Sequence, residues 1–212
     1  MIVETAAVGP FFKNGFVVGC ERTREAVLID PGDEVASLLA FARGQSLAIT
    51  FILLTHAHPD HVTGVPEARR TLNVPILLHE EDLPLYEHAP EEAAKFGIHC
   101  DPLPPVDRFY TAADVIRFGD YEVRPVHTPG HSPGGVCLAV TSPQLQEPQL
   151  FVGDTLFAGS IGSTEFWRGD YDTLIASIRD VLFSFGDAAH VYPGHGPETT
   201  IGRERRMNPF LI

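Results

Sequence analysis

One short stretch decides the fold, Thr55-His56-Ala57-His58-Pro59-Asp60-His61. It follows the apolar run Ile49-Thr50-Phe51-Ile52-Leu53-Leu54, whose length and β-branched content are typical of a buried strand. The histidine cluster is therefore expected on the loop after a strand's C-terminal end. Imidazole and carboxylate groups are ligands of zinc and iron. A polar loop that is rich in His, or a helix cap built on Asp60, is the simpler explanation. The density of ligand-type side chains favours a metal site.

Three later segments repeat this design of a short apolar strand, a Gly or Pro turn and one potential ligand. Residues 121–126 lead into His131, residues 149–152 lead into Asp154, and residues 190–192 lead into His195. Glycine lets the backbone turn sharply and approach an ion closely. Four strand ends that each present His or Asp predict convergence on one cleft at one sheet edge.

Composition limits the class of protein and of substrate. The 212 residues suit one ordinary domain or at most two small ones, and 44% hydrophobic with 20% charged residues is typical of a soluble globular protein. The sequence has neither an apolar run of bilayer-spanning length nor a signal-like N-terminus, so we expect a cytoplasmic protein that does not bind membranes. A net charge of −13 argues against nucleic acid as a partner and favours a small-molecule substrate. The oligomeric state stays open.

The number and spacing of the cysteines also fit a cytoplasmic protein. The chain has three cysteines, an odd number, and they are widely spaced at Cys20, Cys100 and Cys137. This spacing gives neither a disulfide framework nor a CxxC metal clip. We expect reduced, mostly buried thiols.

The pattern of elements predicts an α/β fold. Strands are expected at residues 2–8, 15–20, 26–29 and 75–78 and again from 115 to 152, with helices at 34–42, 65–72 and 171–184 and a short one after Pro197. Residues 79–105 are acidic and Pro-rich and predict short helices and loops. Two mixed sheets that pack face to face beneath outer helices would cover all sheet faces, which makes a four-layer αββα sandwich.

These motifs resemble those of the metallo-β-lactamase superfamily, and within it the short glyoxalase-II-like (hydroxyacylglutathione hydrolase-like) hydrolases. The HxHxDH motif is matched by His56, His58, Asp60 and His61, and the later ligands by His131, Asp154 and His195. Asp30, in an Asp-Pro-Gly turn, fits the family's first motif. The resemblance covers nearly the whole chain. It implies a single domain over residues 1–212 without the C-terminal helical domain of full-length glyoxalase II.

The resemblance also implies a ligand set for two divalent metal ions, zinc first, with iron or manganese as alternatives. One ion would bind His56, His58 and His131, the other Asp60, His61 and His195, with Asp154 as the bridge. Asp60 would also serve catalysis. Asp30 would orient a ligand from behind, or would simply form its turn. Two ions that share a carboxylate can activate a water and polarise a carbonyl, so a metal-bound hydroxide would be the nucleophile. The implied activity is hydrolysis of thioesters or related acyl esters.

The substrate contacts depart from the family pattern at one position. A family segment that usually reads Gly-Arg-Thr-Asp-Phe is here residues 162–166, and Ser163 replaces the arginine. A cation that could meet a glutathione carboxylate is lost, and Arg168 is the nearby candidate to compensate. We therefore expect Ser163 and Arg168 to influence substrate binding, and glutathione conjugates to be discriminated weakly.

Other activities fit the same motifs. An iron-dependent persulfide dioxygenase on this fold would need one iron on His56, His131 and Asp154, and Ser163 counts mildly against it. A non-catalytic binding protein is disfavoured by the intact ligand set, and an RNA-processing member by the negative charge. Fold analogy alone does not separate the hydrolase from the dioxygenase.

Overall fold

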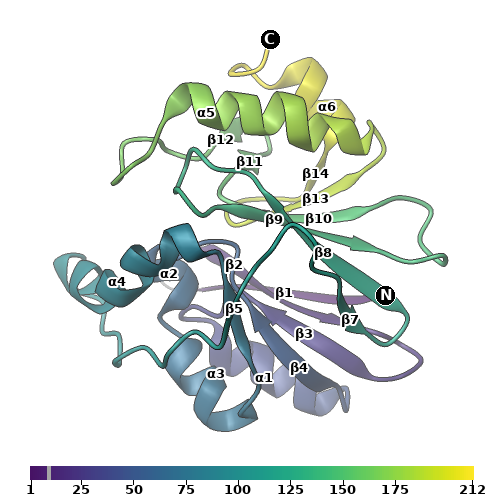
Figure 1. Ribbon diagram of the computed structural model, residues 1–212. Coiled ribbons are helices and arrows are strands. Elements are labelled where there is room, and N and C mark those ends of the chain that lie inside the picture. Colours follow the sequence, from purple (N-terminus) through teal and green to yellow (C-terminus); the bar gives the residue numbers. More distant parts are fainter. Residues whose placement is uncertain (9–10) are drawn as a thin grey trace. The chain divides into compact units, whose positions relative to one another are not determined.

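The computed structural model describes residues 1–8 and 11–212 (Figure 1). Its contacts divide the chain into two compact units. Unit 1 comprises Met1–Tyr110 with Arg117–Asp120, and unit 2 comprises Thr111–Ile116 with Tyr121–Ile212. The expected single domain over residues 1–212 stays a prediction.

Unit 1 contains a mixed sheet. Its six strands follow the order β1 (Ile2–Val8), β2 (Lys13–Gly19), β3 (Glu25–Ile29), β4 (Ala48–Leu53), β5 (Ile76–Leu78) and β6 (Arg108–Phe109). The first three strands are antiparallel neighbours, whereas β3 to β6 run parallel. Carboxyl ends of parallel strands meet at one edge, and residues 55–61 follow β4 at that edge.

The helices of unit 1 include those expected at residues 34–42 and 65–72. They are α1 (Val35–Gly44), α2 (Pro59–Val62), α3 (Val65–Leu72), the 3₁₀ turn η1 (Glu80–Asp82) and α4 (Leu83–Lys95). Helix α1 buries Val35, Leu38, Leu39 and Ala42 on one face, and these side chains join the hydrophobic core of unit 1. Short helices and loops were expected in residues 79–105, and the segment contains η1, the longer helix α4 of 13 residues, which runs through Pro90, and then a loop. The buried residues of α4, Tyr86, Ala89 and Ala93, recur at helical spacing, so packing outweighs the proline.

The second mixed sheet lies in unit 2, apart from residues 117–118 of its last strand, which belong to unit 1. Its order is β14 (Thr199–Thr200), β13 (His190–Pro193), β10 (Gln149–Gly153), β9 (Val136–Thr141), β8 (Tyr121–His127) and β7 (Ile116–Phe118). Strands β10 and β13 are parallel, and each of β8–β9, β9–β10 and β13–β14 is antiparallel. A hairpin of β11 (Leu156–Phe157) and β12 (Ser160–Ile161) was not predicted.

The predicted helix at 171–184 is one helical segment in three forms. It begins as α5 (Tyr171–Ala176), widens to a π-helix (η2, Ser177–Val181) and ends as a 3₁₀ turn (η3, Leu182–Phe185). The short helix after Pro197 is α6 (Ile201–Met207). Leu174, Ile178 and Leu182, one from each of α5, η2 and η3, are buried in one hydrophobic cluster with apolar side chains of the second sheet.

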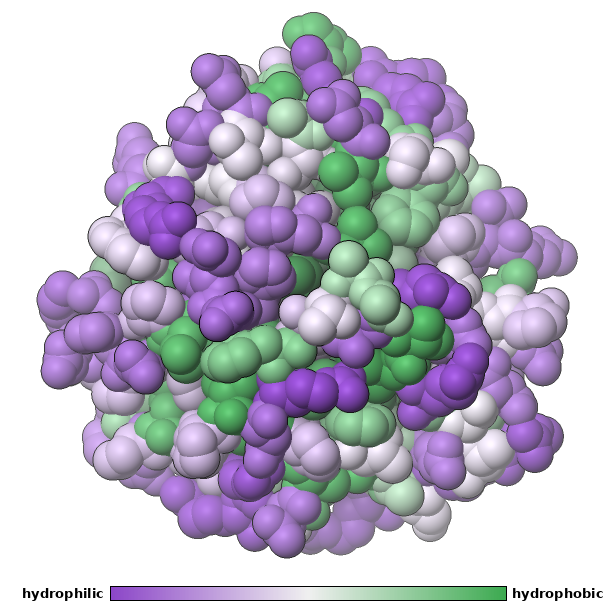
Figure 2. Space-filling view, viewed as in Figure 1, coloured by the Kyte–Doolittle hydropathy of each residue, from purple (hydrophilic) through white to green (hydrophobic). Residues whose placement is uncertain are grey.

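The exposed face in Figure 2 carries both polar and apolar side chains, as the composition of the chain leads one to expect. Figure 2 shows hydrophilic side chains over much of one face, with apolar side chains interspersed among them. Within residues 1–8 and 11–212, no helix combines the length and apolar character needed to cross a membrane. Cys20, Cys100 and Cys137 are all free thiols, and Cys20 and Cys137 are buried.

Candidate metal centre

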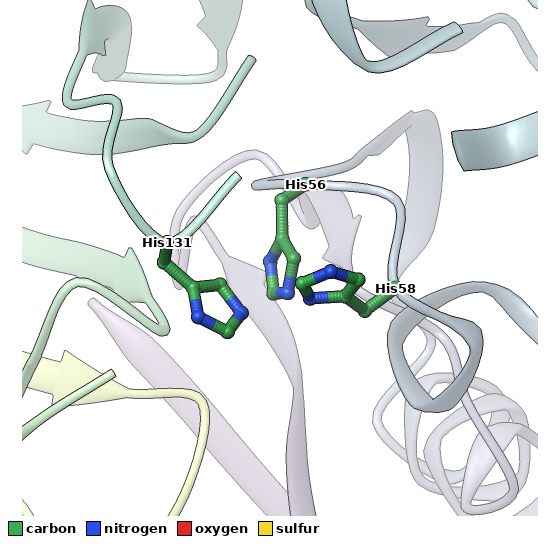
Figure 3. Close-up of side chains that lie close together, drawn as sticks. All are labelled: His56, His58 and His131. Carbon is green, nitrogen blue, oxygen red and sulfur yellow. The ribbon is translucent and has the colours of Figure 1, made fainter. Parts of the chain in front are cut away.

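The first ligand group lies in unit 1 and comprises His56, His58, Asp60 and His61 (the unit 1 ligand group). The chain leaves β4 at Leu53, passes through an extended loop and enters α2 at Pro59. Proline suits the first turn of a helix, because its fixed φ fits and its missing N–H would have no helical partner there. His56 and His58 therefore project from the loop, as Figure 3 shows, whereas Asp60 and His61 belong to the helix.

The imidazoles of this group are packed against one another. The ring centroids of His56 and His58 lie 4.9 Å apart in an edge-on arrangement, and those of His56 and His61 lie 4.0 Å apart. Asp60 Oδ2 lies 3.8 Å from His61 Nε2. His56 and His61 are buried, whereas His58 and Asp60 are partly exposed. One ligand atom from each of Asp30, His56 and His61 lies within 4.8 Å of the others.

Asp30 fixes which nitrogen of these imidazoles carries the proton. Its Oδ2 lies 2.9 Å from His61 Nδ1, and since a carboxylate only accepts, Nδ1 is the donor. The Thr55 hydroxyl donates to the same Oδ2 at 2.6 Å, so its lone pair accepts from His56 Nδ1 at 3.1 Å. Both imidazoles then keep the Nε2 lone pair for a metal ion.

The same contacts bear on the two interpretations of Asp30. Its side chain is 1% exposed and also accepts the Thr55 backbone N–H at 2.7 Å, so its hydrogen bonds reach the histidine loop and not its own turn. Its backbone has φ +47°, a left-handed value that Asp tolerates better than most residues. The geometry supports the orienting role, and the turn places the Asp30 carboxylate within hydrogen-bond distance of Thr55 and His61.

Two residues that support the loop escaped sequence reasoning. Asp82 is fully buried and accepts the Ala57 N–H at 3.0 Å, although it stands in the acidic stretch Glu80-Glu81-Asp82. At Gly32, a Cβ would lie 2.1 Å from the Asp60 carbonyl oxygen. Only glycine therefore allows the Asp30 turn to approach α2 this closely. No local sequence signal marks Asp82, whereas Gly32 was visible in the Asp-Pro-Gly motif.

The second ligand group lies in unit 2 and comprises His131, Asp154 and His195 (the unit 2 ligand group), which follow β8, β10 and β13 respectively. His131, also drawn in Figure 3, donates from Nδ1 to the Ser163 carbonyl at 2.7 Å and so keeps its Nε2 lone pair. Asp154 Oδ2 lies 3.7 Å from His131 Nε2 and 3.4 Å from His195 Nε2. One carboxylate oxygen therefore faces both imidazoles, the position expected of a bridging ligand. A Cβ at Gly162 would lie 1.8 Å from the Asp154 carbonyl, so this approach also requires glycine.

The two residues expected to contact substrate are on the surface of unit 2. Ser163 is exposed, and its hydroxyl accepts the Glu165 N–H at 3.3 Å. Arg168 is exposed, with its guanidinium 5.4 Å from the centre of the Trp167 ring. The Phe166 ring meets His131 edge-on, with centroids 5.8 Å apart. Phe166 and Trp167 are 50% and 51% exposed, which places an aromatic surface beside a ligand histidine.

The donor set of each group fits a divalent metal ion. Neutral imidazoles with the proton directed to an acceptor, together with carboxylates, are the ligands of zinc and iron sites. Hydrogen bonds behind His56, His61 and His131 supply the support that metal-binding histidines require.

Comparison with known proteins agrees with this chemistry. The family model of the metallo-β-lactamase superfamily matches residues 8–199. The chain belongs to this superfamily. Hydroxyacylglutathione hydrolase GloC of Haemophilus influenzae is 36% identical over 213 residues, which cover 100% of this chain and 98% of GloC.

Solved structures show the same relationship. BLEG-1 B3 metallo-β-lactamase matches with a TM-score of 0.89 and 34% identity, covering 99% of both chains. TTHA1623 in a di-iron-bound form has a TM-score of 0.85 and 40% identity, covering 99% of this chain and 100% of that chain. ETHE1 from Myxococcus xanthus has a TM-score of 0.80 and 26% identity, covering 99% and 84% respectively. The predicted fold class, mixed sheets with flanking helices in the metallo-β-lactamase fold, is confirmed. The chain is a hydrolase of this superfamily, whose fold implies divalent metal ions.

Proposed function

We propose that the chain is a glyoxalase-II-like, metal-dependent hydrolase of thioesters or related acyl esters. The observation that carries this proposal is the donor set, in which the hydrogen bonds at Nδ1 of His56, His61 and His131 fix the tautomer whose Nε2 carries the lone pair that a metal ion would bind. Similarity to GloC over the full length of both chains supports the hydroxyacylglutathione hydrolase class.

The proposed ligands are those inferred from the motifs. His56, His58 and His131 would hold one metal ion, Asp60, His61 and His195 the other, and Asp154 would bind both. When bound, two such ions lower the pKa of a water toward neutrality and polarise a substrate carbonyl. Zinc is the proposed metal, with iron as an alternative supported by the di-iron form of TTHA1623, and manganese as a third.

Residues of the chain itself hold the proposed ligand side chains in fixed orientations, as this chemistry requires. Asp30 fixes His61 directly and His56 through Thr55, and the Ser163 carbonyl fixes His131. Asp154 places negative charge next to two imidazoles. Ligands held before the reaction lower the reorganisation that binding and turnover demand. No serine or cysteine nucleophile is needed.

A persulfide dioxygenase is the second candidate. It would use a single iron on His56, His131 and Asp154 with open coordination positions. Similarity to ETHE1 at 26% identity supports testing it. The proposed substrate is a small molecule in either case. A cytoplasmic location, without nucleic-acid or membrane partners, stays a prediction.

One set of assays separates these activities. The purified protein is analysed for zinc, iron and manganese, and then assayed with lactoylglutathione, a simple acyl thioester, a chromogenic cephalosporin and glutathione persulfide under oxygen monitoring. We expect thioester hydrolysis that is lost in Asp154→Ala, and Asp33→Asn serves as a surface control. Persulfide-dependent oxygen uptake without thioester hydrolysis would instead establish the dioxygenase, and turnover of the cephalosporin alone would contradict both.

A further inference from the structure

Lys13 is the most unusual side chain outside the ligand groups. It lies in β2, is only 2% exposed and ranks among the largest fully buried side chains of the described residues. Lysine is almost never fully buried unless it is paired. Its Nζ lies 2.5 Å from Glu34 Oε1, and the Glu34 side chain is itself 0% exposed.

This ion pair forms hydrogen bonds to the backbone on both sides of Pro31, in the turn that carries Asp30. Lys13 Nζ donates to the Asp30 carbonyl oxygen, and Glu34 Oε1 accepts the Gly32 N–H at 2.8 Å. The glycines nearby leave room for it. A Cβ at Gly15 would lie 2.0 Å from Glu34 Oε1, and one at Gly32 would lie 2.9 Å from Lys13 Cε. The absence of a Cβ at these two glycines therefore leaves space for the two charged side chains.

Stability alone does not account for this arrangement. A buried ion pair stabilises a fold only if every polar atom is satisfied, and apolar residues of similar volume often do as well or better. Among the described residues, Glu34 Oε2 is buried and meets no hydrogen-bond donor. The pair thus keeps an incompletely satisfied carboxylate in the core of unit 1, next to a turn with φ +47° at Asp30.

We propose that Lys13 and Glu34 are a positioning pair for metal binding. The pair holds the left-handed Asp30 backbone so that the Asp30 carboxylate reaches His61 Nδ1 at 2.9 Å and the Thr55 N–H at 2.7 Å. Without it, the turn relaxes toward a less strained backbone, the carboxylate moves, and His61 loses its fixed tautomer. The inference rests on the proposed metal binding and not on any substrate.

The test measures zinc affinity by competition with a chromogenic chelator in Lys13→Met, Glu34→Gln and the double variant. Arg69→Met with Asp107→Asn is the matched control, since that pair also lies in unit 1, with Arg69 Nη1 2.6 Å from Asp107 Oδ2. We expect Lys13→Met to weaken zinc binding by about tenfold or more, the range seen when groups behind metal ligands are removed. The control should lose stability but keep its zinc affinity.

A second readout reports ligand position directly. In the cobalt-substituted protein, Lys13→Met should shift the visible absorption bands, whereas the control should not. Glu34→Gln, which keeps side-chain volume, serves if Lys13→Met does not fold, and it should also weaken zinc binding. Unchanged zinc affinity and cobalt spectra in foldable variants would overturn the positioning role while leaving metal binding intact. Failure of the unsubstituted protein to bind zinc or cobalt would overturn both proposals.

Discussion

The Asp30→Asn substitution tests the hydrogen-bond network behind the unit 1 ligand group. Asp30 accepts three hydrogen bonds, two from Thr55 and one from His61. Asparagine keeps the shape of the side chain and tolerates φ +47°, so the backbone strain does not change. Its amide has one accepting oxygen, and its NH₂ group would face at least one donor. The substitution therefore changes the bonding and not the packing.

The magnitude follows from burial. Hydrogen bonds to a charged group contribute about 1.5–3 kcal/mol each, and leaving a buried donor unsatisfied costs about 1–3 kcal/mol. With Asp30 1% exposed and His61 0% exposed, solvent cannot compensate. We expect a loss of about 2–4 kcal/mol in unfolding free energy, from one weakened and one broken interaction. Metal affinity should fall about 10- to 100-fold, because His61 is no longer held in its metal-binding tautomer.

The assay pairs denaturant unfolding of the metal-free protein with chelator competition for zinc. Asp33→Asn is the matched control, since Asp33 is exposed and its carboxylate accepts the Thr63 hydroxyl at 3.1 Å. It should change both quantities little. If Asp30→Asn behaves like Asp33→Asn in zinc affinity, the assigned tautomer of His61 is wrong.

Four further outcomes are expected. Chelation should lower the melting temperature, and zinc, iron or manganese should restore it, because a bound metal stabilises the state that holds it; unchanged melting after verified metal removal would contradict this. Asp154→Ala should lose more activity and more metal than Asp60→Ala, since Asp154 faces two imidazoles and Asp60 one; elemental analysis that finds equal loss would count against a bridge. Ser163→Arg should lower KM for lactoylglutathione about ten- to a hundredfold, as a charged contact to a carboxylate would, but leave simpler thioesters unaffected, with Ser163→Ala as control. Cys100 should alkylate about a hundredfold more slowly than an ordinary thiol at pH 8, because burial, with Asp101 and Asp33 nearby, raises its pKa to about 11; a rate equal to that of the unfolded protein would refute this.

The candidate ligand residues could be selected from the sequence because their information is local. Residue type and spacing in 55–61, after an apolar strand, indicate the unit 1 ligand group without any knowledge of the fold, and its role in metal binding stays a prediction. The same holds for β1, α1 and α3, where periodicity and local breakers place the element ends within a residue or two. The hairpin at 156–161 has two-residue strands, which are too short to show periodicity.

The supporting residues were not predictable because burial of a charge depends on a distant partner. Asp82 meets the N–H of Ala57, and Lys13 meets Glu34, 21 residues away. In sequence, each looks like an ordinary surface charge. Helix α4 was underestimated for the related reason that its packing outweighs Pro90. Sequence patterns thus indicate the candidate metal ligands, whereas the buried residues that contact them are found only in the three-dimensional structure.

The two ligand groups differ in what fixes their imidazoles, and this difference explains the departure at residue 163. In unit 1 the acceptor is the Asp30 side chain, so almost any substitution there removes it. In unit 2 the acceptor for His131 is the backbone carbonyl of Ser163, which every residue type supplies. The side chain at 163 is exposed and can change from arginine to serine without disturbing the ligand. We therefore expect substitutions at position 163 to leave metal binding unchanged, whereas substitutions at position 30 should weaken it.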